Sequence, residues 1–153
     1  MKTDRLKSLV AHQQNILSKI ALGDDSKVFV DICLAIEELI DDESAKCSIL
    51  SLTGEQLFHC AAPSLEPAYC QLVNGITIGD HVGSCGTAAF RRTRVIVNDI
   101  AISPLWINFK ELALSFNLQS CWSTPILSTQ AEVLGTFAIY YDHPKAPSSQ
   151  DLE

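Results

Sequence analysis

Two segments near the N-terminus repeat apolar residues every three or four positions, which is the spacing of one face of an α-helix. The first repeat lies within residues 6–20 and stops before Gly23, a residue type that commonly ends a helix. The second lies within residues 28–40 and follows three consecutive residues suited to an N-cap, at positions 24–26. The pattern therefore predicts two amphipathic helices at the start of the chain.

Further along, the pattern changes to runs that are typical of strands. Short runs at 47–52 and 57–61 are joined by a Thr-Gly-Glu segment, which predicts a hairpin. Longer runs at 119–127 and 133–141 are separated by a short polar connection, so we expect them to pair antiparallel. The last run is apolar on both faces, and a strand of this kind needs cover on both sides of its sheet.

Between these strands, residues 62–116 are punctuated by Pro and Gly and predict a mainly irregular layer. The expected elements are a short helix at 66–73, a second at 84–90, a strand at 94–97, and a helix that follows Ser103 and ends at Asn117. Together the elements predict an α+β fold, with an antiparallel sheet between the N-terminal helices and the irregular layer. An irregular layer over a sheet is a natural place for a cavity.

Several short motifs occur in order along this pattern. They are residues 61–65 (AAPSL), 83–89 (GSCGTAA), 97–100 (VNDI), 104–106 (PLW), 121–126 (CWSTPI) and 133–141 (VLGTFAIYY). In this order they resemble the GAF domains of bacterial sensor histidine kinases and of cyclic-di-GMP enzymes. The resemblance runs from about residue 15 to the last residue, and the fixed order of the motifs makes it specific.

The resemblance implies a GAF fold, with a central antiparallel sheet of about five or six strands. It implies N- and C-terminal helices on one face of the sheet and a pocket layer of loops and short helices on the other. We expect a linker or dimerisation helix at residues 1–23, a sensory domain at 24–147, and the first turn of a truncated exit helix at 148–153. The covalently linked output domain is expected to be a histidine kinase, or a GGDEF or EAL domain of cyclic-di-GMP turnover.

The first candidate ligand-binding residues are Ser84, Cys85 and Thr87. If a helix begins there, its free N–H groups and dipole favour an anion, and the two hydroxyls add hydrogen bonds. In the alternative, Ser84 only caps the helix and Gly86 permits close packing on the sheet. The dipole would also lower the pKa of Cys85, although a buried inert thiol is the simpler interpretation.

A second set of candidates comes from the later motifs. Asp99 ends a strand, where it either faces a ligand or caps a turn, and Trp106 either lines the pocket or packs in the core. Trp122 and Ser123 lie in the middle of a long strand, where an indole could form the floor of a pocket. The hydroxyl of Tyr140 is expected to reach the same cavity, on the face opposite to Phe137. The sequence identifies neither the small-molecule ligand nor a cofactor.

The composition of the chain limits the kinds of partner that it can bind. The chain has 153 residues and a formal net charge of −7, which argues against nucleic acids and against docking on anionic membranes. It contains no run of roughly 18 apolar residues, so we expect no membrane insertion of this segment. Six cysteines without C-x-x-C spacing and the absence of a signal peptide predict reduced thiols in a cytoplasmic protein.

A metal or haem site is the weakest hypothesis. Its candidate ligands are His59, Cys60, Cys70, His81 and Cys85. Their spacing is irregular and matches no known zinc pattern, so we expect no metal site.

An enzymatic alternative comes from one branch of the GAF family, which reduces free methionine-R-sulfoxide and has a cysteine matching Cys85. Its chemistry is thiolate attack followed by disulfide resolution with a second cysteine. The other functional cysteines of that branch match Gly75 and the neighbourhood of residues 107–109, where this chain has no cysteine. Cys121 belongs to a different strand motif. We therefore expect a protein that is not an enzyme.

A third hypothesis is that the domain binds nothing small and only dimerises. The apolar repeat within residues 6–20 is long for a helix that packs on its own sheet. It could pack instead on a second copy, in a four-helix arrangement with the exit helices. We therefore expect a homodimer through the terminal helices.

Overall fold

The sheet has six strands, and every paired neighbour is antiparallel, as the sequence pattern and the GAF resemblance predict. The computed structural model describes residues 26–148; the expected helix within residues 6–20 and residues 149–153 of the expected exit helix lie outside this range. The strands are β1 (Lys46–Thr53), β2 (Gln56–Ala61), β3 (Ile76–Thr77), β4 (Val95–Val97), β5 (Ser120–Leu127) and β6 (Val133–Tyr141). Their order across the sheet is β3-β2-β1-β6-β5-β4.

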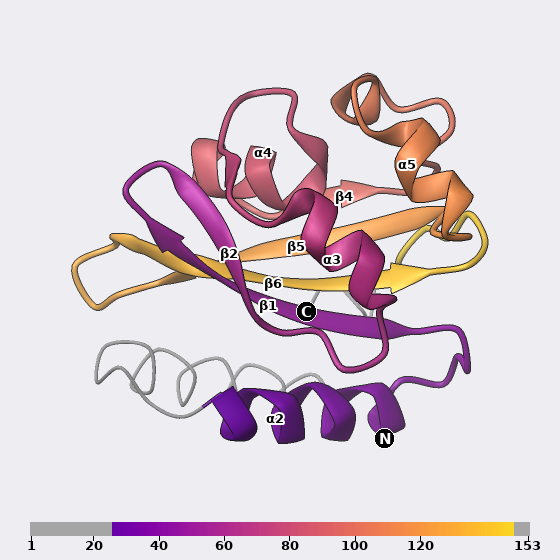
Figure 1. The fold of residues 1–153 in the computed structure, drawn as a ribbon, viewed down its shortest axis with the longest axis horizontal. Coiled ribbons are helices and arrows are strands. Elements are labelled where there is room, and N and C mark those ends of the chain that lie inside the picture. Colours follow the sequence, from indigo (N-terminus) through magenta and orange to yellow (C-terminus); the bar gives the residue numbers. More distant parts are fainter. Residues whose placement is uncertain (1–25, 149–153) are drawn as a thin grey trace.

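One face of the sheet is covered by α2 (Ser26–Leu39), which lies below the strands in Figure 1. Its apolar stripe packs on inward-facing residues of the central strands, since Phe29, Cys33 and Ile36 form a buried cluster with Cys47 and Phe137. The apolar residues that recur every 3.6 positions in the helix therefore pack against those that recur every two positions in the strands.

The opposite face carries the expected layer of short helices, above the sheet in Figure 1. Its members are α3 (Pro67–Val73), α4 (Gly83–Arg91), the 3₁₀ turn η1 (Pro104–Trp106) and α5 (Lys110–Ser115). A second and larger apolar cluster lies between these helices and the sheet. The strand β6 is thus covered on both faces, as its sequence requires.

The helix expected after Ser103 is interrupted. Ser103 accepts a hydrogen bond from Leu105 N at its start, as an N-cap should, and Asn117 has the left-handed backbone expected at its end (φ +61°). Between them, Phe109 leaves helical geometry, with φ −131° and ψ −4°. Trp106, at the end of η1, and Phe109, just before α5, both line one cavity despite the interruption.

Within residues 26–148, no helix is both long enough and apolar enough to cross a lipid bilayer.

A polar side chain also holds α2 against the sheet. Glu37 accepts a hydrogen bond from Cys47 N at the start of β1 (2.9 Å) and another from Ser64 Oγ in the loop before α3 (2.5 Å). One carboxylate therefore connects the helix on one face to the layer on the other.

Candidate functional site

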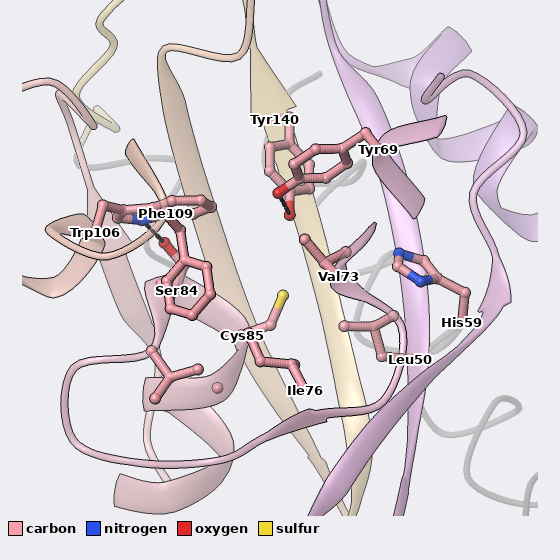
Figure 2. Close-up of a pocket in the computed structure, with 13 residues that line it drawn as sticks. Leu50, His59, Tyr69, Val73, Ile76, Ser84, Cys85, Trp106, Phe109 and Tyr140 are labelled. Carbon is pink, nitrogen blue, oxygen red and sulfur yellow. Dashed lines mark hydrogen bonds between the residues drawn. The ribbon is translucent and has the colours of Figure 1, made fainter. Parts of the chain in front are cut away.

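A cavity of about 40 Å³ lies between the sheet and the layer of short helices. Figure 2 shows its lining residues, which come from β1, β2, β3, β6, α3, α4, η1 and the connections between them. Four of the eight predicted site residues line it: Ser84, Cys85, Trp106 and Tyr140. The other four do not, and each has a different structural position.

The start of α4 is fixed by Gly83, which brings the next two residues to the cavity wall. Gly83 has a left-handed backbone (φ +63°), and a Cβ at this position would lie 3.4 Å from the ring of Trp106. A residue with a side chain is disfavoured there by backbone conformation, and the indole leaves little room. Because the chain turns sharply at this glycine, Ser84 and Cys85 lie in the first turn of the helix and at the cavity.

Ser84 does not cap the helix, contrary to the structural alternative drawn from the sequence. The N-cap position is Val82, without a side-chain bond, and Ser84 is inside the first turn. Its hydroxyl donates to the carbonyl of Cys121 (2.9 Å) and accepts from Trp106 Nε1 (3.1 Å), the latter bond shown in Figure 2. Ser84 thereby joins α4 to β5 and fixes the indole that forms one wall of the cavity.

Thr87 is fully buried and does not line the cavity. Its hydroxyl donates to Gly83 O (2.5 Å) and accepts from Val82 N (3.1 Å), which closes the first turn of α4. Gly86 gives room to the side chain of Val82, whose Cγ1 lies 2.5 Å from where a Cβ would stand, and not to the sheet. Thr87 therefore supports the wall from behind, whereas Val82 and Gly86 are themselves part of the lining.

Cys85 points its sulfur into the cavity (Figure 2) and lies over β5. Ser123, completely buried behind it, donates a hydrogen bond from Oγ to Cys85 Sγ at 3.3 Å. The thiol of Cys121 is the largest cause that lowers the pKa of Cys85, and Ser123 and Thr136 lower it further, against the opposing effect of burial. Burial raises the pKa of Cys121, so Cys85 is the more acidic thiol of the two.

Tyr140 lines the cavity as predicted, and its hydroxyl lies 3.1 Å from that of Tyr69 on α3. The two rings meet edge to face with centroids 5.9 Å apart, and Trp106 adds a second edge-to-face contact to Tyr140 at 6.4 Å. Burial raises the pKa of both tyrosines, so both hydroxyls stay protonated. Tyr69 was not predicted as a site residue, although it is the only aromatic residue of the expected 66–73 helix.

His59 also lines the cavity. The sequence analysis named it only as a candidate metal ligand and not as a residue of the ligand-binding site. It reaches the cavity from β2, and its Nδ1 is buried without a hydrogen-bond partner among the described residues. Burial lowers the pKa of His59, and Asn74 opposes that effect only in part. The imidazole is therefore neutral at physiological pH and can either accept or donate one hydrogen bond.

The candidates for a metal site are not brought together. His59 and Cys85 line the cavity, but Cys60 packs with the cluster beneath α2, and His81 is exposed beside Asp80. Across residues 26–148, no group of three or more His, Cys, Asp and Glu side chains is arranged to hold a metal ion.

Trp122 and Asp99 lie away from the cavity. Trp122 is placed between Cys121 and Ser123, which face the cavity layer, so its indole points to the other face of the sheet. There it donates from Nε1 to Lys145 O (3.1 Å) and contacts the ring of Tyr141 in a tilted arrangement, with centroids 5.0 Å apart. The expectation that Trp122 forms the pocket floor is therefore corrected. Asp99 accepts from Ala101 N at 3.1 Å and caps a turn, the alternative given for it.

The cavity is electrostatically neutral. Its walls within the described part of the chain contain no Asp, Glu, Lys or Arg, and most of its surface is aliphatic or aromatic. Its polar groups are the Tyr69–Tyr140 hydroxyl pair, the His59 ring, the Cys85 thiol, the Ser84 hydroxyl and the Trp106 indole N–H, and burial keeps the two tyrosines and the imidazole uncharged at neutral pH. Burying an unpaired charge in such surroundings costs several kcal/mol. The site can therefore hold a small neutral molecule, and it contains one acidic thiol.

Comparison with known proteins gives one curated relative and several solved folds. The chain is 34% identical over 148 residues to the methyl sulfide methyltransferase-associated sensor of Methanosarcina acetivorans, covering 95% of this chain and 15% of that protein. The chain thus spans less than a sixth of that relative's length.

Two solved structures share the fold at low identity. One is a domain assigned to a two-component sensor histidine kinase of Sinorhizobium meliloti, with a TM-score of 0.65, 19% identity and coverage of 82% of this chain and 78% of that one. The other is the type II free methionine-R-sulfoxide reductase of Thermoplasma acidophilum, with a TM-score of 0.63, 20% identity and coverage of 84% and 85%.

The sequence profile of the family described as "GAF domain" matches residues 24–153, which is most of the chain. The match includes the six-stranded sheet and every element that surrounds the cavity. This protein therefore belongs to the GAF domain family.

Proposed function

We propose that this GAF domain is a regulatory sensor that binds a small uncharged molecule in the cavity between the sheet and α3, α4 and η1, and that it is not an enzyme in its own right. The observation that carries the proposal is the lining itself, a mainly apolar wall with a few convergent polar groups and, among the described residues, no Asp, Glu, Lys or Arg. Pockets of this composition typically bind small molecules.

The volume limits the size of the guest. A cavity of about 40 Å³ has room for about three water molecules, far below the roughly 300–1,000 Å³ of pockets for drug-sized ligands. A guest of a few heavy atoms fits without rearrangement. A larger guest requires movement of side chains such as Val73 and Phe109, which line the cavity from α3 and from the turn before α5.

The polar groups at the cavity wall determine which hydrogen-bonding groups a bound molecule must have. In the Tyr69–Tyr140 pair one hydroxyl donates to the other, and the proton of the acceptor is left to bind a guest. The buried Nδ1 of His59 is another group that gains from a partner. A neutral guest with one acceptor and one donor, or a single hydroxyl, satisfies both.

The proposed signal path runs around the edge of the sheet. A guest that shifts α3 also shifts the loop before it, where Ser64 holds Glu37 of α2. The ligand changes helix pairing only by its different affinity for the two states. In this proposal the domain acts as a cytoplasmic homodimer whose terminal helices pass the change to a covalently linked output domain, either a histidine kinase or a cyclic-di-GMP enzyme. The sensor named among its relatives supports a signalling role.

A thermal-shift screen tests the binding proposal. Neutral molecules of a few heavy atoms should raise the free energy of unfolding by about 2–3 kcal/mol at a hundredfold excess over their Kd, whereas amino acids and nucleotides should not. Tyr140→Phe should weaken the effect, and Trp122→Phe, on the other face, should leave it intact. Stabilisation by charged molecules alone would contradict the proposed ligand class.

The small cavity also favours a second candidate, a dimerisation module that binds no ligand. In that case side chains already fill the space that a guest would need, and the domain would relay changes in helix pairing alone. The two candidates separate in one experiment. A ligand-free module shows a dimer by light scattering and no response to any member of the neutral series, including in the Phe109→Ala variant with its enlarged cavity.

The free methionine-R-sulfoxide reductase alternative is less favoured. Free methionine sulfoxide is a zwitterion, and among residues 26–148 the cavity wall has no charged side chain for either its ammonium or its carboxylate. Turnover of the free sulfoxide with a thiol reductant would support this alternative against the sensor proposal.

A further inference from the structure

Two buried thiols lie next to each other at the wall of the cavity. Cys85, on α4, is 8% exposed and lines the cavity, and Cys121, on β5, is completely buried beside it. Two hydrogen bonds hold these segments together, from Ser84 Oγ to Cys121 O and from Ser123 Oγ to Cys85 Sγ. Each thiol also shifts the pKa of the other, that of Cys85 downward and that of Cys121 upward, as expected for neighbouring sulfurs. Neither binding of a neutral guest nor support of the fold requires this pair of sulfurs.

The protein contains a second buried pair that serves as an internal comparison. Cys33 of α2 and Cys47 of β1 are both fully buried in the cluster on the opposite face of the sheet. There burial raises the pKa of Cys33 to about 12 and that of Cys47 well above its usual value. The two pairs share residue type and burial, but only the pair at the cavity has an acidic member with access to a small molecule.

We propose that Cys85 and Cys121 form a redox-active dithiol, which a small neutral peroxide entering the cavity oxidises to a disulfide. Hydrogen peroxide and short alkyl hydroperoxides have the size and the lack of charge that the cavity requires. The proposal uses the same cavity as the sensor function but needs no reversible ligand, so either can fail without the other.

The chemistry balances with the peroxide as the named oxidant. The thiolate sulfur of Cys85 attacks one peroxide oxygen; the S–O bond forms, the O–O bond breaks, and the leaving oxygen takes up a proton to become water or an alcohol. The sulfur of Cys121 then attacks the sulfenic sulfur of Cys85; the S–S bond forms, the S–O bond breaks, and the hydroxide leaves as water with the Cys121 proton. Two thiols are oxidised and one peroxide is reduced.

The residues around the two thiols favour attack by Cys85 first and resolution by Cys121 second. The hydroxyl of Ser123 stabilises negative charge on Cys85 Sγ, and the N-terminal turn of α4 adds the positive end of its dipole. Cys121 has no access to the cavity and is therefore the resolving partner. The resulting disulfide joins α4 to β5 covalently and changes the wall that a guest would contact.

The test uses the unmodified protein. The reduced chain is treated with hydrogen peroxide, alkylated, digested without reductant and analysed by mass spectrometry. The expected result is a peptide pair linked through Cys85 and Cys121 that dithiothreitol separates, while Cys33 and Cys47 are recovered as alkylated thiols. Oxidation that leaves Cys85 and Cys121 as free thiols, or that links Cys33 to Cys47 first, would overturn the proposal.

Two variants identify the roles. Cys121→Ser should stop the reaction at the sulfenic acid of Cys85, which a dimedone adduct on that residue detects. Ser123→Ala keeps both thiols and should slow oxidation by about threefold, because it removes a hydrogen bond to the attacking sulfur. A Ser123→Ala rate equal to that of the unmodified protein across pH 6–9, with the fold intact, would contradict the role of Ser123.

Discussion

Lys145 Nζ lies 2.9 Å from Asp42 Oδ2, so the segment that follows β6 is bonded to the chain that leaves α2. His143 Nε2 lies 2.9 Å from the same carboxylate oxygen, and Ser44 donates to the other oxygen at 2.8 Å. The backbone of the same segment is held by Asn98 O, which accepts from Lys145 N. The end of the helix beneath the sheet and the chain after the last strand therefore meet at Asp42.

Replacing Asp42 should loosen this junction. Asp42→Asn keeps the size of the side chain but removes its charge from four hydrogen bonds, so we expect a loss of about 2 kcal/mol in the free energy of unfolding. Urea denaturation measures the loss. Asp41→Asn, at the neighbouring exposed position, is the matched control and should change stability by less than about 0.5 kcal/mol. Equal effects of the two variants would exclude a special role for Asp42.

The same junction makes the free energy of unfolding depend on pH. One contribution is lost as the pH falls, and another is lost as the pH rises. The pKa of Asp42 is held well below its usual value, with Lys145 the largest favourable cause against burial, so its contribution is present above about pH 4 and is lost below that. Asp42 raises the pKa of His143, so the contribution of His143 is present below about pH 6.5 and is lost as the pH rises through the raised value.

The pH prediction is best measured as a difference between proteins. The pKa of His59 is lowered by burial, so this residue removes stability below about pH 6.5 and opposes His143 in the unmodified chain. Subtracting the stability of His143→Gln from that of the unmodified protein cancels the effect of His59. The difference should be largest near pH 5 and smallest near pH 9; a difference that grows with pH would have the wrong sign.

Gly83 should resist substitution more than another glycine of the same conformation. Gly54 and Gly83 have φ of +62° and +63°, but a Cβ at Gly54 meets nothing within 4 Å, whereas one at Gly83 lies 3.4 Å from Trp106. Gly54→Ala should therefore cost only the backbone strain, about 1 kcal/mol. Gly83→Ala should cost the same strain, because its Cβ only reaches van der Waals contact with the indole, whereas Gly83→Val should also displace the indole, which chemical denaturation and near-UV circular dichroism of the tryptophans can detect.

The sheet could be predicted because its signals are local. The runs that became β1, β2, β5 and β6 are adjacent pairs joined by short connections, and β6 is apolar on both faces, so pairing and double cover follow from the sequence alone. The side that Trp122 faces was also predictable but was assigned incorrectly. Successive strand residues point to opposite faces, so Ser123 and Trp122 could not both line one pocket.

The set of residues that meet at the cavity wall could not be predicted from local sequence patterns. Tyr69 meets Tyr140 across 71 positions of sequence, and His59 of β2 lines the cavity together with residues of α3 and α4 that lie far from it in the sequence. The break at Phe109 was not predictable either, since the local apolar spacing favours a continuous helix. The contact between Cys85 and Cys121 depends on the same tertiary packing, which brings α4 onto β5.

The two tryptophans provide separate optical reporters for the two faces of the sheet. Trp106 is 3% exposed, lines the cavity and donates to Ser84, whereas Trp122 lies on the opposite face and donates to Lys145 O. A guest or a disulfide at Cys85 should therefore change the emission of Trp106 alone, because only that indole lies at the cavity wall.

Single-tryptophan variants make the prediction specific. Trp122→Phe should retain the full fluorescence response to a neutral ligand or to peroxide, and Trp106→Phe should lose most of it. Acidification through the pH range of the Asp42 junction should instead change Trp122, whose partner Lys145 is bonded to that carboxylate. A response to ligand carried by Trp122 would mean that binding is transmitted through the sheet to the junction of α2 with the chain after β6.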